Sequence, residues 1–345
     1  MIKKHYGNIT VIFALDLARK DIEDYKTVTR DILDTPRLVA EHVIEVDSVR
    51  FWGGEKNALL PAAREALKPI VGRQPANTVY FGNCLTNPVA LALKRFAPVN
   101  HLYHAPGDFV SMLFPVGNPW KTRLKNLVKR VLGRELYMIE PSDLPIFSLL
   151  NFKAMPRFAH VDFRDFDSAP VRAKLAGLIG QVTAGRTHIM LLLAGDEPEP
   201  GDKNPSNIEK YLPPHLQVVR QVMEDDGISV ATVWCKEHRS YLPLTPAERS
   251  ALTQAFAGIG CDVRFVADYL TPEYRFLPGE CILSCCPFSY IVAEPSSFLL
   301  NVAEADITPV MAVSAFAPYR DANQQGRNAE FVAINKLLTT SIRIY

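Results

Sequence analysis

Short apolar runs alternate with longer amphipathic segments along most of the chain. In the first half, strand-like runs lie at 9–15, 77–83 and 99–104, a polar segment follows the first of them, and helical patterns lie at 59–71 and 88–97. In the second half, helical patterns at 170–185, 212–227 and 245–260 are interleaved with strand-like runs at 187–196, 229–238, 262–268 and 290–293, and a short apolar run lies at 281–287. Near-continuous apolar strands between helices are typical of parallel sheets covered on both faces. The pattern therefore predicts an α/β fold.

The polar, proline-ended segment 160–170 separates two halves of similar length. We expect a Rossmann-like domain on each side of it, at 1–165 and 166–345, with the two domains facing a central cleft. In such sheets, ligands bind beyond the C-terminal ends of the strands. The loops that follow the strands are therefore where we expect functional residues.

Composition narrows the class of protein. The chain has 345 residues, 48% of them hydrophobic, and a formal net charge of +1, so no global attraction to nucleic acid is expected. The apolar runs are strand-sized, well short of the roughly 20 residues that span a bilayer, and the N-terminus lacks a signal-peptide pattern. We expect a cytoplasmic protein. The six cysteines form no C-x-x-C pair, and we expect buried free thiols.

Two loops of the first half carry polar side chains after a strand. Gly82 and Asn83 end the second strand-like run, and His104 and Asp108 lie in the loop after the third. A carboxylate held on a Pro-Gly loop at a strand end can serve as a general base. The alternative is a surface turn, because Pro-Gly-Asp is ordinary turn chemistry.

Three segments of the second half complete the set of candidates. Lys236 and His238 end a strand, where they could bind or protonate a phosphate, although a solvated loop would look the same. Glu280 could bind nucleotide sugar hydroxyls, or could simply be a charged residue at a strand start. Ser296 and Ser297 lie between a strand and a helical run. They could cap that helix or bind an anion at its start.

The order of these segments resembles the bacterial sialyltransferase and polysialyltransferase family. "PGDF" resembles its acidic-Gly motif, "KEHRS" its Lys-x-His-Pro motif with Arg239 in place of the proline, "LPGECIL" its Pro-x-Glu-Leu segment and "EPSSFLL" its Ser-Ser motif. Asp108 matches the base of the family, His238 its histidine, and Ser296 and Ser297 its phosphate-binding serines. In the acidic motif, glycine here precedes the aspartate instead of following the acidic residues.

The resemblance implies a GT-B fold with an N-terminal acceptor domain and a C-terminal nucleotide-sugar domain. It implies an inverting glycosyltransferase that moves sialic acid from CMP-sialic acid to a cell-surface glycan, such as a capsule or lipooligosaccharide. Asp108, or alternatively His104 or Glu55, would be the base, and His238 would stabilise the leaving CMP. A Kdo transferase using CMP-Kdo, or a non-catalytic nucleotide- or glycan-binding protein, are the alternatives.

The remaining site residues are assigned within that scheme. The donor-binding set comprises Gly82, Asn83, Lys236, Glu280, Ser296 and Ser297, and the acceptor-binding set comprises His104, Lys121 and Arg123. CMP carries one phosphate, and no Asp-x-Asp motif lies where a metal-bound nucleotide would need it, so neither a metal nor a cofactor is expected.

A basic amphipathic helix is predicted at 118–137. Its apolar face includes Trp120 and Val128, and its basic positions include Lys121 and Arg123. Such a helix can lie on an anionic membrane surface, which would give peripheral contact with the inner membrane, or bind an anionic glycan or glycolipid acceptor. It can equally be a core-packed helix with a basic solvent face.

Overall fold

The parts of the chain that can be described lie mainly in its C-terminal half. The computed structural model describes residues 9–16, 27–28, 30–32, 38–46, 56–71, 80–81, 102–103, 128, 146–148, 150–153, 158–160, 162–196, 207–237, 243–302, 306–340 and 342–345.

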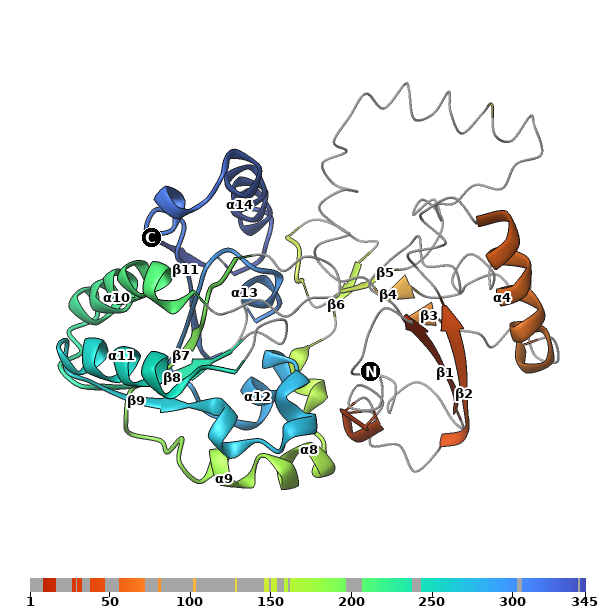
Figure 1. Ribbon diagram of the computed structural model, residues 1–345, viewed down its shortest axis with the longest axis horizontal. Coiled ribbons are helices and arrows are strands. Elements are labelled where there is room, and N and C mark those ends of the chain that lie inside the picture. The colour runs from red at the N-terminus through yellow and green to blue at the C-terminus, as the bar shows by residue number, and fades with distance from the viewer. Residues whose placement is uncertain are drawn as a thin grey trace.

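A six-stranded parallel sheet organises the C-terminal half (Figure 1). Its strands are β7 (His188–Leu192), β8 (Ala231–Lys236), β9 (Cys261–Phe265), β10 (Tyr290–Ala293), β11 (Thr308–Met311) and β12 (Arg343–Ile344). Their spatial order is β12-β11-β10-β7-β8-β9. Numbered within the sheet, this is the 3-2-1-4-5-6 order of a doubly wound Rossmann-like fold. The strand order reverses between β7 and β10, which are direct neighbours.

Helices cover both faces of this sheet. The helices are α8 (Ala169–Lys174), α9 (Ala176–Ile179), α10 (Ile208–Asp225), α11 (Pro246–Ala257), α12 (Gly279–Cys285), α13 (Ser297–Asn301) and α14 (Ala322–Asn335). Because side chains alternate along a strand, β7 sends Ile189 and Leu191 into a core with α10 and α11. It sends Met190 into a second core, with Trp234 and residues of α8, α9, α12 and α13. Figure 1 shows α10 and α11 together, away from α8, α9 and α12.

Several helix starts follow from their local sequence. Thr245 and Glu248 form a reciprocal capping box at α11, and Asp321 and Gln324 form one at α14. Ser168 caps α8 by accepting a hydrogen bond from the Val171 N–H at 3.2 Å. These pairs satisfy backbone donors that a helix leaves unpaired at its first turn.

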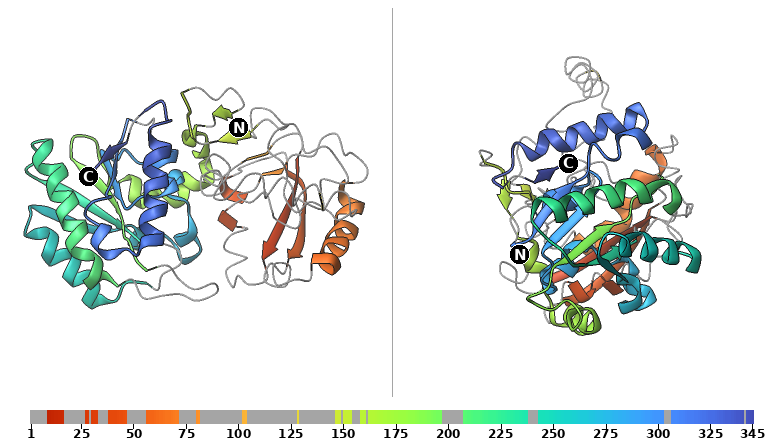
Figure 2. Two further views of the ribbon diagram at one scale, coloured as in Figure 1. Left: turned by 90° about the horizontal axis from the view of Figure 1, so that it is seen from above. Right: turned by 90° about the vertical axis from the view of Figure 1, so that its left-hand side faces the viewer.

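The described N-terminal elements form two smaller parallel sheets. β1 (Ile9–Asp16) pairs with β2 (Leu38–Val46), and β3 (Tyr80–Phe81), β4 (Leu102–Tyr103), β5 (Ile146–Ser148) and β6 (Phe158–His160) pair in that order. The helix α4 (Lys56–Val71) follows β2. The left view of Figure 2 shows the long red and orange strands and the orange helix on the side away from the blue and dark-green helices.

One N-terminal segment contacts the C-terminal half directly. The Ser168 hydroxyl donates to the Asp31 carbonyl at 2.7 Å, and the Tyr274 hydroxyl donates to the Asp31 carboxylate. Val28 packs into the same core as α8 and α12. Leu150, from the end of the first half, packs there too. The two domain ranges and the GT-B arrangement remain predictions.

The α/β prediction is confirmed, with local corrections. The apolar run at 281–287 lies largely in α12, so Glu280 is in a first helical turn and not at a strand start. The helix expected at 170–185 ends at α9 and is interrupted at Leu175. Strand β2 lies within the first half where a polar segment was expected, and β11, β12 and α14 were not predicted.

Two further observations concern burial and length. Five cysteines, all except Cys84, are free and buried, as expected. Among the described helices, none is both long enough and apolar enough to cross a bilayer. Within the expected basic helix only Val128 is described, and it is 48% exposed.

Candidate functional site

The reversal of strand order fixes where a ligand can approach the six-stranded sheet. At the C-terminal end of β7 the chain continues through Gly195 and Asp196, and at the end of β10 through Glu294, Pro295 and Ser296. In an open α/β sheet these two turns diverge to opposite faces and leave a crevice between them. The predicted Ser-Ser turn therefore lies at this reversal point.

Ser296 is the N-cap residue of α13 but does not cap it. Its backbone is extended, with φ −149° and ψ 156°, and its side chain makes no capping hydrogen bond. Among the described residues, its Oγ is buried and has no hydrogen-bond partner. A buried hydroxyl without a partner is costly, so an incoming hydrogen-bonding group would stabilise it. Ser297 is the first residue of α13 and is half-buried.

Glu280 and α13 are joined by a hydrogen bond. Asn301 Nδ2 donates to Glu280 Oε1 at 2.8 Å, whereas the Asn301 Oδ1 is buried and unpaired among the described residues. Glycine at 279 permits this approach of α12 to α13, because a Cβ there would lie 2.5 Å from the Phe298 ring. Ser297 and Asn301 are four residues apart and share one face of α13.

Lys236 ends β8 on the same side of the sheet as α12. Burial lowers the pKa of Lys236 below its ordinary value of 10.5, and the nearby carboxylates of Glu280 and Glu237 offset this only in part. The Glu280 carboxylate therefore acts electrostatically on the Lys236 ammonium. A half-buried lysine at a strand end can bind an anion strongly because little water competes for it.

Glu237 has a structural role next to Lys236. Its Oε2 lies 3.1 Å from Arg275 Nη2, and its Oε1 lies 3.8 Å from Arg249 Nη2. Arg249 also pairs with Asp268 at 2.6 Å. These ion pairs tie the end of β8 to α11 and to the segment after β9.

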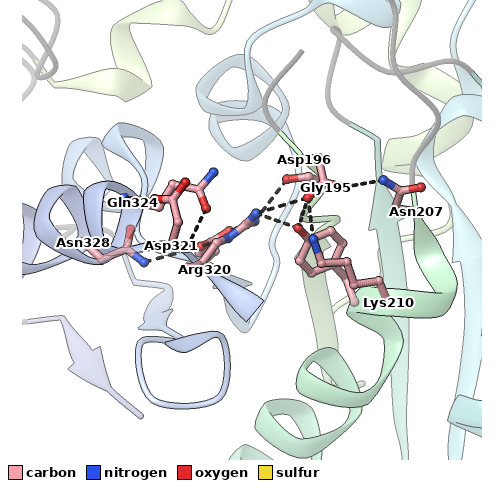
Figure 3. Close-up of polar contacts among 10 residues, drawn as sticks. Gly195, Asp196, Asn207, Lys210, Arg320, Asp321, Gln324 and Asn328 are labelled. Carbon is pink, nitrogen blue, oxygen red and sulfur yellow. Dashed lines mark hydrogen bonds and ion pairs between the residues drawn. The ribbon is translucent and has the colours of Figure 1, made fainter. Parts of the chain in front are cut away.

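A second polar network lies at the same end of the sheet on the α10 side (Figure 3). Asp196 accepts hydrogen bonds from Asn207 Nδ2, from the Tyr211 hydroxyl and, at 2.7 Å, from Lys210 Nζ. Burial alone would raise the pKa of Asp196, but the hydrogen bonds from Lys210, Tyr211 and Asn207 bring it below its ordinary value of 3.8. The protein's own carboxylate therefore occupies the donors of the first turn of α10.

Arg320 is at the centre of this network. Its Nε donates to Glu294 Oε1 at 2.6 Å, its Nη1 to the Tyr211 hydroxyl at 2.7 Å, and its Nη2 to the Gly195 carbonyl at 3.1 Å. Nη2 also donates to Glu294 Oε2, which makes the ion pair bidentate. The Arg320 side chain is only 5% exposed. Figure 3 shows it reaching from the start of α14 toward Gly195 and Asp196.

His215, in α10, holds the turn after β7 through a hydrogen bond to its backbone. Its Nε2 accepts the Ala194 N–H at 3.0 Å, and its ring meets Phe316 edge-on at a centroid distance of 5.0 Å. Burial, with a smaller contribution from the Arg320 charge, lowers the pKa of His215 to about 3. The ring is therefore neutral in the folded protein at physiological pH.

The His215 pKa predicts a pH dependence of stability. Between pH 6.5 and 3 the unfolded chain protonates this histidine and the folded chain does not, so stability falls as pH decreases. The slope from this one group approaches about 1.4 kcal/mol per pH unit. In His215→Gln, whose amide oxygen can still accept the Ala194 N–H, urea titrations at pH 5.5 and 4.5 should show a loss smaller by about 1.3 kcal/mol. Equal losses of unfolding free energy between pH 5.5 and 4.5 in the wild type and in His215→Gln would contradict the lowered pKa of His215.

The structure places only part of the predicted site. Four of the predicted residues lie at the C-terminal ends of strands in the six-stranded sheet or at the starts of α12 and α13: Lys236, Glu280, Ser296 and Ser297. The other candidates lie outside the described residues: Glu55, Gly82, Asn83, His104, Asp108, Lys121, Arg123, His238 and Arg239. Their roles remain predictions. The described residues contain no cluster of three or more potential metal ligands.

Sequence reasoning missed several residues of this region. Glu294 directly follows β10, and Asp196 lies in the loop that follows β7, which is a signal that could have identified them. Asn301 and Arg320 gave no such signal, because each meets its carboxylate partner only through the packing of helices distant in sequence.

Comparison with known proteins does not assign this chain to a family. No protein-family model matches the sequence, and no curated protein matches it.

Proposed function

We propose that the protein is an inverting glycosyltransferase that transfers sialic acid from CMP-sialic acid to a cell-surface glycan acceptor. The observation that carries the proposal is the buried hydroxyl of Ser296, which has no partner among the described residues and lies at the reversal of a Rossmann-like sheet. Such reversal points are where open α/β sheets bind nucleotides. The motif resemblance, from "KEHRS" to "EPSSFLL", supplies the substrate class.

In this proposal the CMP phosphate binds at the turn between β10 and α13. The Ser296 and Ser297 hydroxyls donate hydrogen bonds to its oxygens, and Lys236 contributes positive charge from the end of β8. Since α13 has five residues, the hydroxyls and the lysine are assigned the main role and the helix dipole a minor one. The Ser296 hydroxyl, which lacks a partner within the described part of the chain, supports this assignment because a phosphate oxygen would satisfy it.

Glu280 and Asn301 are assigned to the nucleoside. Together they present a carboxylate and an amide oxygen that no described residue pairs with, and both groups accept hydrogen bonds. Sugar hydroxyls and an exocyclic amine are the donors that a cytidine offers to such acceptors. Asn301 is an addition to the set of residues that the sequence suggests.

The chemistry is a single displacement at the anomeric carbon. An acceptor hydroxyl oxygen forms the new bond to that carbon while its bond to the phosphate oxygen breaks, and the electron pair leaves with CMP. Asp108, matched by the resemblance, takes the proton of the acceptor hydroxyl. His238 and the two serines stabilise the charge that develops on the leaving phosphate.

A ligand screen tests the proposal. CMP should raise the melting temperature whereas UDP, GDP and ADP should not, and at 100 times the dissociation constant the stabilisation should be about 2.7 kcal/mol. Release of CMP from CMP-sialic acid supports a sialyltransferase. Release of CMP from CMP-Kdo but not from CMP-sialic acid supports a Kdo transferase instead. CMP binding with no release from either donor, with candidate acceptors present, supports a non-catalytic binder. Absence of any CMP effect overturns the proposal.

A further inference from the structure

The turn that carries Ser296 and Ser297 is joined at its start to a buried arginine. Glu294 directly precedes Pro295 and Ser296, and both of its carboxylate oxygens are bound by Arg320, which lies 26 positions later in the chain. Asn328 Nδ2, from α14, lies 3.4 Å from Glu294 Oε1. The start of the Ser-Ser turn is thus held by Arg320 and Asn328, side chains that lie 26 and 34 positions later in the chain.

The same arginine holds the turn after β7. Its Nη2 donates to the Gly195 carbonyl at 3.1 Å, and its Nη1 lies 3.9 Å from Asp196 Oδ1. Its guanidinium stacks over the Tyr211 ring at 4.6 Å from the centroid, and its Nη1 donates to the hydroxyl of that ring. One side chain therefore joins both turns that border the reversal of strand order, as Figure 3 shows for Gly195 and Asp196.

This network is not itself a site for an anionic ligand. Two carboxylates, Asp196 and Glu294, lie within it, and they would repel a phosphate. The donors around them, including Lys210 and Arg320, already bind these carboxylates. An anion at the reversal point would have to approach from the α12 and α13 side, where none of the described residues pairs with the Ser296 hydroxyl.

We propose that Arg320 is a positioning residue, which holds the turn between β10 and α13 in the geometry that binds the nucleotide phosphate. This inference rests on the proposed function. A planar guanidinium binds a carboxylate through two parallel hydrogen bonds and still has donors for a carbonyl and a hydroxyl. A lysine ammonium keeps the charge but cannot form this fixed fork, so Arg320→Lys tests the geometry and not the charge.

The matched control is Arg343→Lys. Arg343 also pairs with a carboxylate, Asp226 at 2.7 Å, and contacts a tyrosine hydroxyl, that of Tyr345 at 3.3 Å. Its guanidinium binds Asp226 just after α10, where the chain returns toward the start of β8, so this ion pair lies away from the Ser-Ser turn at the end of β10.

Two measurements follow, one without ligand. Hydrogen exchange of the free proteins should show faster exchange in peptides covering 290–302 in Arg320→Lys than in wild type, with peptides of β8 and β9 unchanged. Titration calorimetry with CMP, below the melting temperature of every variant, should show affinity weakened by about tenfold to a hundredfold in Arg320→Lys. Arg343→Lys should match wild type in both.

The outcomes separate this inference from the proposed function. If wild type does not bind CMP, the proposed function fails, and the exchange data still decide whether Arg320 positions the turn. If wild type binds CMP and Arg320→Lys shows the same affinity and the same local exchange, the inference is overturned. Faster exchange across the whole sheet, with no local excess at 290–302, also overturns it because Arg320 would then support only global stability. If Arg320→Lys does not fold, Glu294→Gln replaces it and should change exchange and affinity in the same direction.

Discussion

Replacing Arg320 with alanine will lower the free energy of unfolding by about 3–5 kcal/mol. The substitution leaves the Glu294 carboxylate, whose side chain is 18% exposed, without its bidentate partner. It also removes the donor to the Gly195 carbonyl and the cation over the Tyr211 ring. A buried charge that loses its partner cannot regain full hydration, so most of the pairing energy is lost. Urea denaturation at pH 7 measures the change.

Arg343→Ala provides the comparison. Its ion pair with Asp226 has a similar short distance, 2.7 Å, but the two side chains are 35% and 23% exposed. Water screens such a pair, so we expect a loss of only about 0–1 kcal/mol. Equal losses in the two alanine variants would show that burial of Arg320 does not strengthen its network, contrary to our expectation.

Replacing both Ser296 and Ser297 with alanine will slow CMP release from CMP-sialic acid by about 100-fold or more. Each hydroxyl is assigned to the leaving phosphate, where negative charge develops as the bond to the sugar breaks. Stability should change little, because the Ser296 hydroxyl makes no capping hydrogen bond and has no partner among the described residues. Turnover is measured from CMP release and stability from urea denaturation.

Ser168→Ala is the control for this pair. Its hydroxyl does cap a helix, α8, and also donates to the Asp31 carbonyl. We therefore expect the opposite result, a stability loss of about 0.5–2 kcal/mol with normal CMP release. If the double serine variant instead loses stability and keeps its turnover, the serines act as helix caps and the phosphate site lies elsewhere.

Much of the C-terminal sheet could be predicted from its sequence pattern. The runs around Met190, Trp234 and Ile291 are apolar at nearly every position because both faces of the strands are buried. The pattern was weaker where a strand carries charges, as in β2 with Glu41 and Glu45, and that strand was missed. It was ambiguous at 281–287, where a short apolar run fits a buried strand or a buried helix equally well.

The candidate site was most predictable where its residues follow strands. Lys236 and Ser296 could be placed at strand ends by counting along the chain. The partners of Glu280 and Glu294 could not, since Asn301 and Arg320 reach them across 21 and 26 positions. Helical and strand periodicities relate only residues a few positions apart, so they do not predict contacts over such distances in sequence.

By itself, the sequence determined the class of fold and the position of the Ser-Ser turn between a strand and a helix. Both are local properties, because hydrophobic periodicity and turn chemistry act over a few neighbouring residues. The tertiary structure alone decided the strand order, and with it the adjacency of β7 and β10. It also decided that Arg320 is buried between two carboxylates and that the Ser296 hydroxyl has no partner in the described part of the structure. These features arise from packing between distant segments, where burial sets the strength of each charge and hydrogen bond.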